Sequence, residues 1–180
     1  FRIGLMEPDA FTPLTIETTL DPKVQPFLFD HKIDDIPVLP GVMGLEAFAE
    51  AALALLPGWH VEAIEDVEFF APFKFYHNKP RTVTVEAAIH PVEGALVADC
   101  KLIGRRSLPN QTEPTVTTHF AARVRLTNEP KAPTSSAKPE TPAKNVITSD
   151  DIYRLYFHGP TYQVVEKAWR DGDRVVGLMA

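Results

Sequence analysis

The chain has 180 residues, of which 44% are hydrophobic, and its formal net charge is −6. This length can bury a full hydrophobic core and is typical of one domain, or of one domain with part of another. The acidic balance, without a cluster of basic residues on any expected element, argues against a nucleic-acid partner. Cys100 is the only cysteine, which excludes an internal disulfide and any multi-cysteine zinc site and is typical of a reducing compartment. Because no uncharged apolar run is long enough to span a bilayer and no signal peptide opens the chain, we expect a cytoplasmic protein without a membrane partner.

The first clear pattern is a β-strand near the N-terminus. Residues 14–20 alternate apolar with polar side chains, as a half-buried strand does, and Asp21 and Pro22 end the pattern. Residues 24–29 then form a short apolar segment. This segment is expected to deliver His31 to the edge of a hydrophobic core.

The strongest helix signal lies in residues 41–56, which are apolar on nearly every face of a helix. A helix that is apolar all round is a buried helix. Pro57 and Gly58 end it. Since β-patterns surround this helix on both sides in the sequence, we expect an antiparallel sheet wrapped round it.

Four later segments have the composition of β-strands. Residues 59–70 are rich in aromatic and β-branched side chains, and residues 81–89, 95–103 and 115–126 alternate apolar with polar positions. One buried helix and five or six antiparallel strands are therefore complete by Leu126. In the last strand the expected inward positions are Val116, Thr118, Phe120, Ala122, Val124 and Leu126, and the expected outward ones are Thr117, His119, Arg123 and Arg125.

Residues 127–148 mark a change in composition, with four prolines and no aromatic residue. Such a segment cannot bury enough apolar surface to offset its chain entropy, so we interpret it as a linker without regular structure. After it, Ser149 or an adjacent aspartate is expected to cap a short helix that leads into strand-like sequence. The sequence therefore predicts a domain over 1–126, a Pro-rich linker over 127–148, and the start of a second, incomplete domain over 149–180.

The loop before the helix carries the candidate chemistry. His31 has an ordinary pKa near ~6.5, which suits a general base at neutral pH. Pro40 is suited to the start of a helix, where the first amides have no intrahelical partner. The amide of Gly41 could therefore stabilise a carbonyl oxygen that gains negative charge.

This loop resembles that of the dehydratases with the hot-dog fold, in which a sheet wraps a central helix. Polyketide synthase dehydratase domains carry the motif H-x-x-x-G-x-x-x-x-P; His31 and Pro40 match it, whereas Asp35 stands at the glycine position. Residues 37–47 also look like the helix entry of free-standing β-hydroxyacyl dehydratases of fatty acid synthesis. The run F-H-G-P-T-Y-Q at 157–163 resembles the opening of the second hot dog in double-hot-dog dehydratases, most of all in iterative synthases of polyunsaturated fatty acids and enediynes.

The resemblance implies an α+β hot-dog fold, an antiparallel sheet wrapped round a central helix, as the first half of a double hot dog. It implies a hydro-lyase that dehydrates a β-hydroxyacyl chain to a trans-2-enoyl thioester within a polyketide or fatty acid synthase. His31 would remove the α-proton, and Gly41 would bind the enolate-like oxygen. The substrate would arrive on the phosphopantetheine of an acyl carrier protein, without a metal or other cofactor. The expected partners are that carrier protein, the neighbouring synthase domains and a second hot dog, in a homodimer or a pseudo-dimer.

The acid that protonates the leaving hydroxyl has two candidate sources. In free-standing dehydratases the acidic residue at the Glu46 position is catalytic, so Glu46 of one chain could face His31 of another. In double-hot-dog dehydratases the acid lies on the helix of the second fold, which is beyond this sequence. Glu46 has a simpler interpretation as a carboxylate that faces solvent or binds the loop.

Two other function classes compete with a dehydratase. A hot-dog thioesterase would hydrolyse the same thioester, although it usually relies on a carboxylate without this histidine motif. A non-catalytic hot dog that binds acyl chains or holds a dimer together is favoured by Asp35 at the motif's glycine position. Among the other ionisable side chains we expect no metal site, a structural His158, and a core thiol at Cys100; His60, His77, His90 and His119 lack the spacing of metal ligands.

Overall fold

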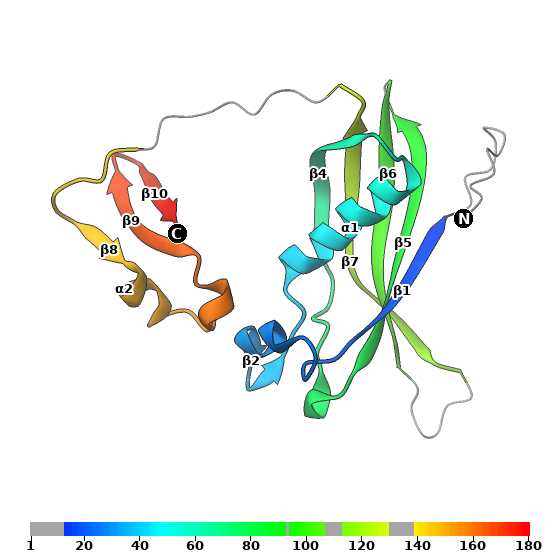
Figure 1. The fold of residues 1–180 in the computed structure, drawn as a ribbon, viewed down its shortest axis with the longest axis horizontal. Coiled ribbons are helices and arrows are strands. Elements are labelled where there is room, and N and C mark those ends of the chain that lie inside the picture. Colours follow the sequence, from blue (N-terminus) through cyan, green and yellow to red (C-terminus); the bar gives the residue numbers. More distant parts are fainter. Residues whose placement is uncertain (1–12, 93, 107–112, 130–138) are drawn as a thin grey trace.

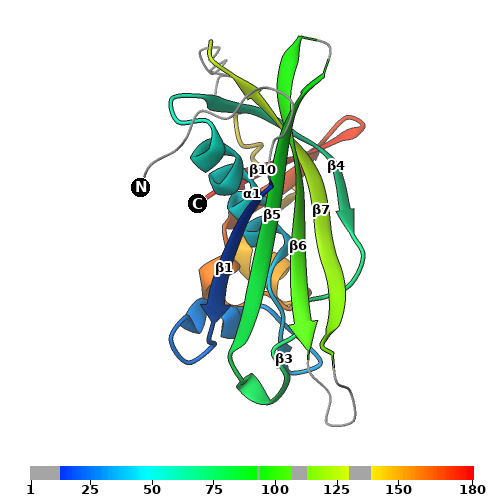
Figure 2. The same ribbon diagram turned by 90° about the vertical axis from the view of Figure 1, so that its right-hand side faces the viewer.

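The computed structural model describes residues 13–92, 94–106, 113–129 and 139–180. Its main element is a five-stranded antiparallel sheet in the order β1-β5-β6-β7-β4 (Figures 1 and 2). The five strands are β1 (Leu14–Leu20), β4 (His60–Phe69), β5 (Arg81–Val92), β6 (Ala95–Arg106) and β7 (Thr115–Thr127). Each of the strands predicted from alternation is present, and β5 and β6 run three residues beyond their expected ends.

The helix α1 (Gly41–Leu55) packs across one face of this sheet and contacts all five strands. Its buried residues are Gly44, Phe48, Ala51 and Ala52, which form one stripe at helical spacing. The expectation of a helix buried on every side is wrong, because Val42 on another side is 65% exposed. Within the described residues the sheet covers only one side of the helix. Apolar side chains on the other sides of the helix, such as Val42 and Met43, therefore remain exposed.

The hydrophobic core lies between α1 and the sheet. It comprises the alternating positions of β5, β6 and β7 together with Phe48, Phe73 and Phe75, which are fully buried. Cys100 is buried in this core, as expected, and burial raises the pKa of its thiol to about 12. The thiol is therefore protonated and inert at neutral pH.

The expected alternation of β7 fails in its first half. His119, expected outward, is only 5% exposed, and Val116, expected inward, is 57% exposed. The reason is a β-bulge: Leu102 pairs with Phe120 while the next residue, Ile103, pairs with Thr118. The extra residue on β7 exchanges the two faces of the strand before the bulge.

Four short elements connect β1 to α1 and β4 to β5. They are the 3-10 helix η1 (Pro26–Asp30), the two-residue strands β2 (Lys32–Ile33) and β3 (Ile36–Pro37), and the 3-10 helix η2 (Tyr76–Asn78). Strands β2 and β3 form a tight hairpin with Asp34 and Asp35 as its turn. This hairpin carries His31 at its start and leads directly into α1.

The C-terminal part forms a separate small sheet in the order β10-β9-β8. Its elements are β8 (Val146–Thr148), α2 (Ser149–Tyr153), the 3-10 helix η3 (Pro160–Tyr162), β9 (Val165–Asp171) and β10 (Arg174–Met179). The cap of α2 is Thr148 rather than Ser149 or a neighbouring aspartate, and it forms a capping box with Asp151.

The segment interpreted as a linker is shorter than the sequence indicated. Thr127 still belongs to β7, and Val146–Thr148 form strand β8, which pairs with β9. Residues 130–138 of this segment lie outside the described residues. Residues 128–129 and 139–145 contain no helix or strand.

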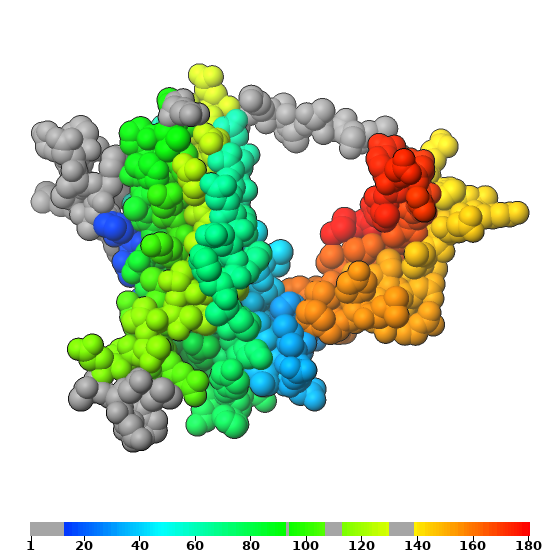
Figure 3. Space-filling model, turned by 180° about the vertical axis from the view of Figure 1, so that it is seen from behind, coloured from blue at the N-terminus to red at the C-terminus, as the bar shows by residue number. Residues whose placement is uncertain are grey.

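The C-terminal part contacts the N-terminal part at the loop that carries His31. Seen from behind in Figure 3, the orange segment around η3 lies against the blue loop that carries His31. There His31 and His158 form an antiparallel β-bridge. Among the described residues no helix has the length and apolar character needed to cross a membrane.

Candidate active site

The loop from Asp30 to Pro40 positions His31 by a single strong contact. The Nδ1 nitrogen of His31 lies 2.9 Å from the carbonyl oxygen of Val38. A carbonyl can only accept a hydrogen bond, so Nδ1 carries the proton and Nε2 remains the basic nitrogen. The Val38 amide in turn donates to the His31 carbonyl over 2.9 Å, which closes the hairpin.

Asp35 fits the turn at which the dehydratase motif has glycine. Its φ is +60°, and that of Asp34 is +52°. A two-residue hairpin turn with both angles positive favours glycine and asparagine, and aspartate tolerates this conformation better than most residues. The departure from the motif therefore leaves the hairpin, and the contact between His31 and Val38, in place.

Three aromatic rings from the C-terminal part surround His31. The ring centroids of Phe157, His158 and Tyr162 lie 5.1, 5.6 and 5.8 Å from that of the imidazole, each in an edge-to-face arrangement. Burial lowers the pKa of His31, the hydrogen bond to Val38 opposes this shift, and the nearby His158 adds to it. His31 is accordingly neutral at pH 7, with Nε2 able to accept a proton.

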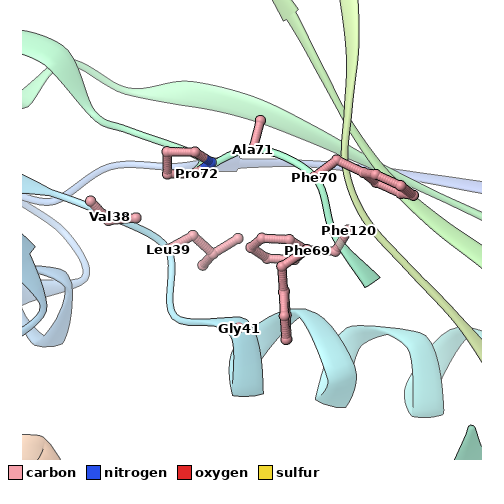
Figure 4. Close-up of a pocket in the computed structure, with 8 residues that line it drawn as sticks. All are labelled: Val38, Leu39, Gly41, Phe69, Phe70, Ala71, Pro72 and Phe120. Atoms are coloured by element: carbon pink, nitrogen blue, oxygen red, sulfur yellow. The ribbon is translucent and has the colours of Figure 1, made fainter. Parts of the chain in front are cut away.

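An apolar cavity of about 340 Å³ lies at the start of α1, next to Val38 (Figure 4). Phe69 and Phe120 form one wall as an edge-to-face pair with ring centroids 5.2 Å apart. A Cβ atom at Gly41 would lie 2.6 Å from the Phe69 ring, so any larger residue there would require the ring to move. The lining residues are Val38, Leu39, Gly41, Phe69, Phe70, Ala71, Pro72 and Phe120.

The first residue of α1 lines this cavity. Pro40 is the N-cap and supplies no side-chain hydrogen bond to the helix. Gly41 is the first helical residue, and amides at this position have no partner inside the helix. Gly41, at the N-terminus of α1, thus lies at the wall of an apolar cavity.

Glu46 lies on a different side of α1. It is exposed, and with Glu50 it lines a second cavity, of about 360 Å³, between β1 and the helix. Among the described residues no contact joins Glu46 to His31. His31 contacts Val38, which lines the cavity at Gly41, whereas Glu46 lines the other cavity.

The ring cluster around His31 was not predicted from the sequence. Phe157, His158 and Tyr162 follow His31 by more than 120 residues, and no local pattern pairs the two segments. The signal that could have found them is the F-H-G-P-T-Y-Q run, which the sequence indicated only as the opening of a second fold. His158 was expected to be structural, yet its ring faces the candidate base.

A second histidine, His119, is buried away from this loop. Its Nδ1 lies 3.0 Å from the Ala71 carbonyl oxygen, its Nε2 has no hydrogen-bond partner, and burial lowers its pKa. Its ring packs edge-to-face on Phe73. In the described part of the chain no group of three or more His, Cys, Asp or Glu side chains is placed to hold a metal ion.

Comparison with known families identifies the fold. The sequence-family model of the polyketide synthase dehydratase domain matches residues 8–97, which is half of the chain. The chain belongs to this dehydratase family. The resemblance noted for the loop from His31 to Pro40 is thereby confirmed, and the match includes the whole of that loop and α1.

Curated relatives of this dehydratase chain are large synthases. It is 26% identical over 163 residues to the polyketide synthase ThaG of Burkholderia thailandensis, covering 86% of this chain and 3% of the relative. It is 24% identical over 157 residues to one component protein of a polyunsaturated fatty acid synthase from Thraustochytrium sp., covering 86% of this chain and 5% of the relative. The chain thus spans a small fraction of each relative.

Solved dehydratase structures have the same fold. The crystal structure of an inactive mutant of CurJ dehydratase matches with a TM-score of 0.65 and 18% identity, covering 97% of this chain and 59% of that one. The predicted α+β hot-dog fold is confirmed by this match and by the antiparallel sheet that packs on one helix. The chain corresponds to somewhat more than half of a solved dehydratase, as expected for the first half of a double hot dog.

Proposed function

We propose that this domain dehydrates a β-hydroxyacyl thioester to a trans-2-enoyl thioester, with His31 as the general base. The observation that carries the proposal is the hydrogen bond of His31 Nδ1 to the Val38 carbonyl, beside the cavity at the start of α1. It fixes the tautomer in which Nε2 is basic and ties the ring to Val38, a residue that lines the cavity. The inactive CurJ mutant, in which a histidine is replaced by phenylalanine, supports a base of this kind.

The reaction has three requirements, and the described residues supply two of them. Nε2 of His31 takes the α-proton of the thioester, and the electrons move onto the thioester oxygen. The amide of Gly41 donates a hydrogen bond to that oxygen as it gains negative charge, in an apolar surrounding where such a contact is strong. An acid then protonates the β-hydroxyl, which leaves as water while the double bond forms.

The acid has two candidate sources. Glu46 lines the cavity between β1 and α1 and not the one at Gly41, which supports a role for it at the site of a second copy. A helix of a second hot dog would supply the acid to His31 within a pseudo-dimer. The Glu46→Gln variant separates these sources: a loss comparable to that of a His31 variant assigns the acid to Glu46, and near-normal turnover assigns it to the second fold.

The substrate class follows from the cavity and from the relatives. The cavity at Gly41 is lined by apolar side chains, which suits an acyl chain rather than a charged ligand. We infer that the chain arrives on the phosphopantetheine of an acyl carrier protein within a polyketide or polyunsaturated fatty acid synthase. The domain needs no cofactor of its own in this scheme, because thioester acidity and the Gly41 contact supply the activation.

The deciding experiment is the His31→Ala variant in the intact synthase. Loss of a general base typically lowers the rate by about 10²- to 10⁴-fold. We expect β-hydroxyacyl intermediates to accumulate on the carrier protein, as mass spectrometry of the carrier arm would detect. Normal dehydration by this variant would refute the proposal and favour a non-catalytic hot dog, whereas release of free acid by the unaltered domain would indicate a thioesterase.

A further inference from the structure

The C-terminal segment 157–162 is tied to the residue that precedes the candidate base. The Asp30 carboxylate accepts hydrogen bonds from the Thr161 amide, over 3.0 Å, and from the Thr161 hydroxyl. The Asp30 carbonyl accepts a third from the Gly159 amide over 2.7 Å. These bonds lower the pKa of the Asp30 carboxyl, since both Thr161 donors favour its charged form.

Gly159 permits this close approach. Its φ of −75° is open to any residue, so backbone conformation does not require glycine here. A Cβ atom would lie 2.5 Å from Oδ1 and 2.8 Å from Cα of Asp30. Any side chain at Gly159 would therefore push the C-terminal segment away from the loop.

The hydrogen bonds at Asp30 also determine the surroundings of His31, because the residues on both sides of the contact are neighbours in the chain. Asp30 precedes His31, and Phe157, His158 and Tyr162 flank Gly159 and Thr161. When Thr161 holds Asp30, the three rings are held against the imidazole at 5.1 to 5.8 Å between centroids. Asp30 thus has Thr161 as its partner and does not orient His31 by a direct contact.

We propose that Asp30 and Thr161 form a latch that positions His31, so that the C-terminal part of the chain builds one wall of the active site. Both are positioning residues, because neither touches the imidazole through its side chain. The proposal rests on the proposed function only where it calls His31 the base. The contact that buries His31 can be tested without any measurement of activity.

Titration of His31 measures the latch directly. The burial that lowers the His31 pKa comes in part from the three rings, so release of the segment should raise this pKa toward its ordinary value near ~6.5. The other titratable groups at the ring are His158 and Tyr162, and Asp30 and Lys32 are its neighbours in the chain. Because substitution of Asp30 or His158 would change the electrostatic surroundings of the ring directly, the informative variants are those that leave both unchanged.

The test compares Thr161→Val with Thr161→Ser in the full chain, by NMR titration of the His31 ring protons. Valine keeps the shape and the amide but lacks the hydroxyl, whereas serine keeps the hydroxyl. We expect Thr161→Val to raise the His31 pKa and Thr161→Ser to leave it unchanged. The Thr19→Val variant removes an exposed hydroxyl bonded to Thr82 between strands β1 and β5, and it should also leave the pKa unchanged.

A further single variant and a double variant distinguish release of the segment from a general loss of structure. Gly159→Ala, which leaves Asp30 and His158 unchanged, should also raise the His31 pKa, and adding Thr161→Val to it should cause no further rise, because both changes release the same segment. An unchanged His31 pKa in Thr161→Val, or additive shifts in the double variant, would overturn the latch.

Turnover distinguishes failure of the latch from failure of the proposed function. If His31 is the base, Thr161→Val should lower kcat by about 10- to 100-fold, since small misplacements of a catalytic group cost this much, with little change in KM. A shifted His31 pKa together with normal dehydration by His31→Ala would retain the latch and reject the proposed function.

Discussion

The two parts of the molecule are held together by different forces. The five-stranded sheet and α1 enclose a continuous apolar core in which Phe48, Phe73 and Phe75 are fully buried. The three-stranded C-terminal sheet buries two large apolar side chains among its described residues, Trp169 and Leu178. The first part is stabilised mainly by burial of apolar surface, and the second has little of it.

The C-terminal part is accordingly rich in exposed apolar side chains. Leu155 is 84% exposed, and an apolar cavity of about 550 Å³ opens between α2 and the small sheet. Its contact with the rest of the molecule is made by main-chain and side-chain hydrogen bonds at Asp30 and by rings around His31. The candidate active site therefore lies between a part that has a large hydrophobic core and a part that has little core of its own. Unfolding of the first part, or separation of the second part from it, would disrupt the site.

The largest effect is expected from the core beneath α1. Phe48→Ala should lower the free energy of unfolding by about 3–5 kcal/mol, because a fully buried ring is replaced by a cavity. Urea unfolding followed by circular dichroism would measure it. The matched control is Val42→Ala on the exposed side of the same helix, which should change the stability by less than about 0.5 kcal/mol. Equal effects of both variants would mean that the helix does not bury one stripe.

A smaller effect is expected where the helix approaches the sheet most closely. A Cβ atom at Gly44 would lie 2.4 Å from the Phe120 ring. Gly44→Ala should therefore destabilise the first part by about 1–3 kcal/mol through overpacking, although alanine favours a helix. Differential scanning calorimetry would show a lower Tm. A gain in stability would show that Phe120 can move aside.

The helix cap of the C-terminal part gives a test of independence. Thr148→Ala removes the capping box of α2 and should cost about 0.5–2 kcal/mol of local stability. Hydrogen exchange should then speed up in residues 146–153 while the core amides of β5 and β6 keep their protection. Equal acceleration in both parts would mean that they unfold as one unit.

The smallest effect is a dependence of stability on pH. Burial lowers the pKa of both His31 and His119, so the unfolded chain binds more protons than the folded chain just below the ordinary pKa of ~6.5. Stability should therefore be fully present above about pH 6.5 and fall as the pH decreases through the window between the unfolded and the lowered folded pKa values.

His119→Asn isolates one part of this dependence. Asparagine can donate to the Ala71 carbonyl as Nδ1 does, but it does not titrate, so the loss of stability below about pH 6.5 should become shallower. Denaturant unfolding at a series of pH values would detect the change. His77→Asn, at an exposed position, is the control, and an equal flattening by it would contradict the assignment to His119.

Local sequence patterns were sufficient for most of the fold. Alternation located four strands of the main sheet, aromatic and β-branched composition located β4, and the apolar run at 41–56 located α1 to within one residue. The motif from His31 to Pro40 also identified the loop, because its residues are neighbours in the chain. The spacing of apolar side chains and the capping of helices depend on a few consecutive residues, which is why the sequence determines them.

Only the tertiary structure decided which surfaces are buried and which side chains meet. The sequence did not reveal the bulge that turns His119 inward, the open side of α1, or the position of Glu46 away from His31. It also separated Asp30 from Thr161 by more than 120 residues, although they share a hydrogen bond. These features depend on pairing between segments far apart in the chain, where register and packing, and not local propensity, set the lowest free energy.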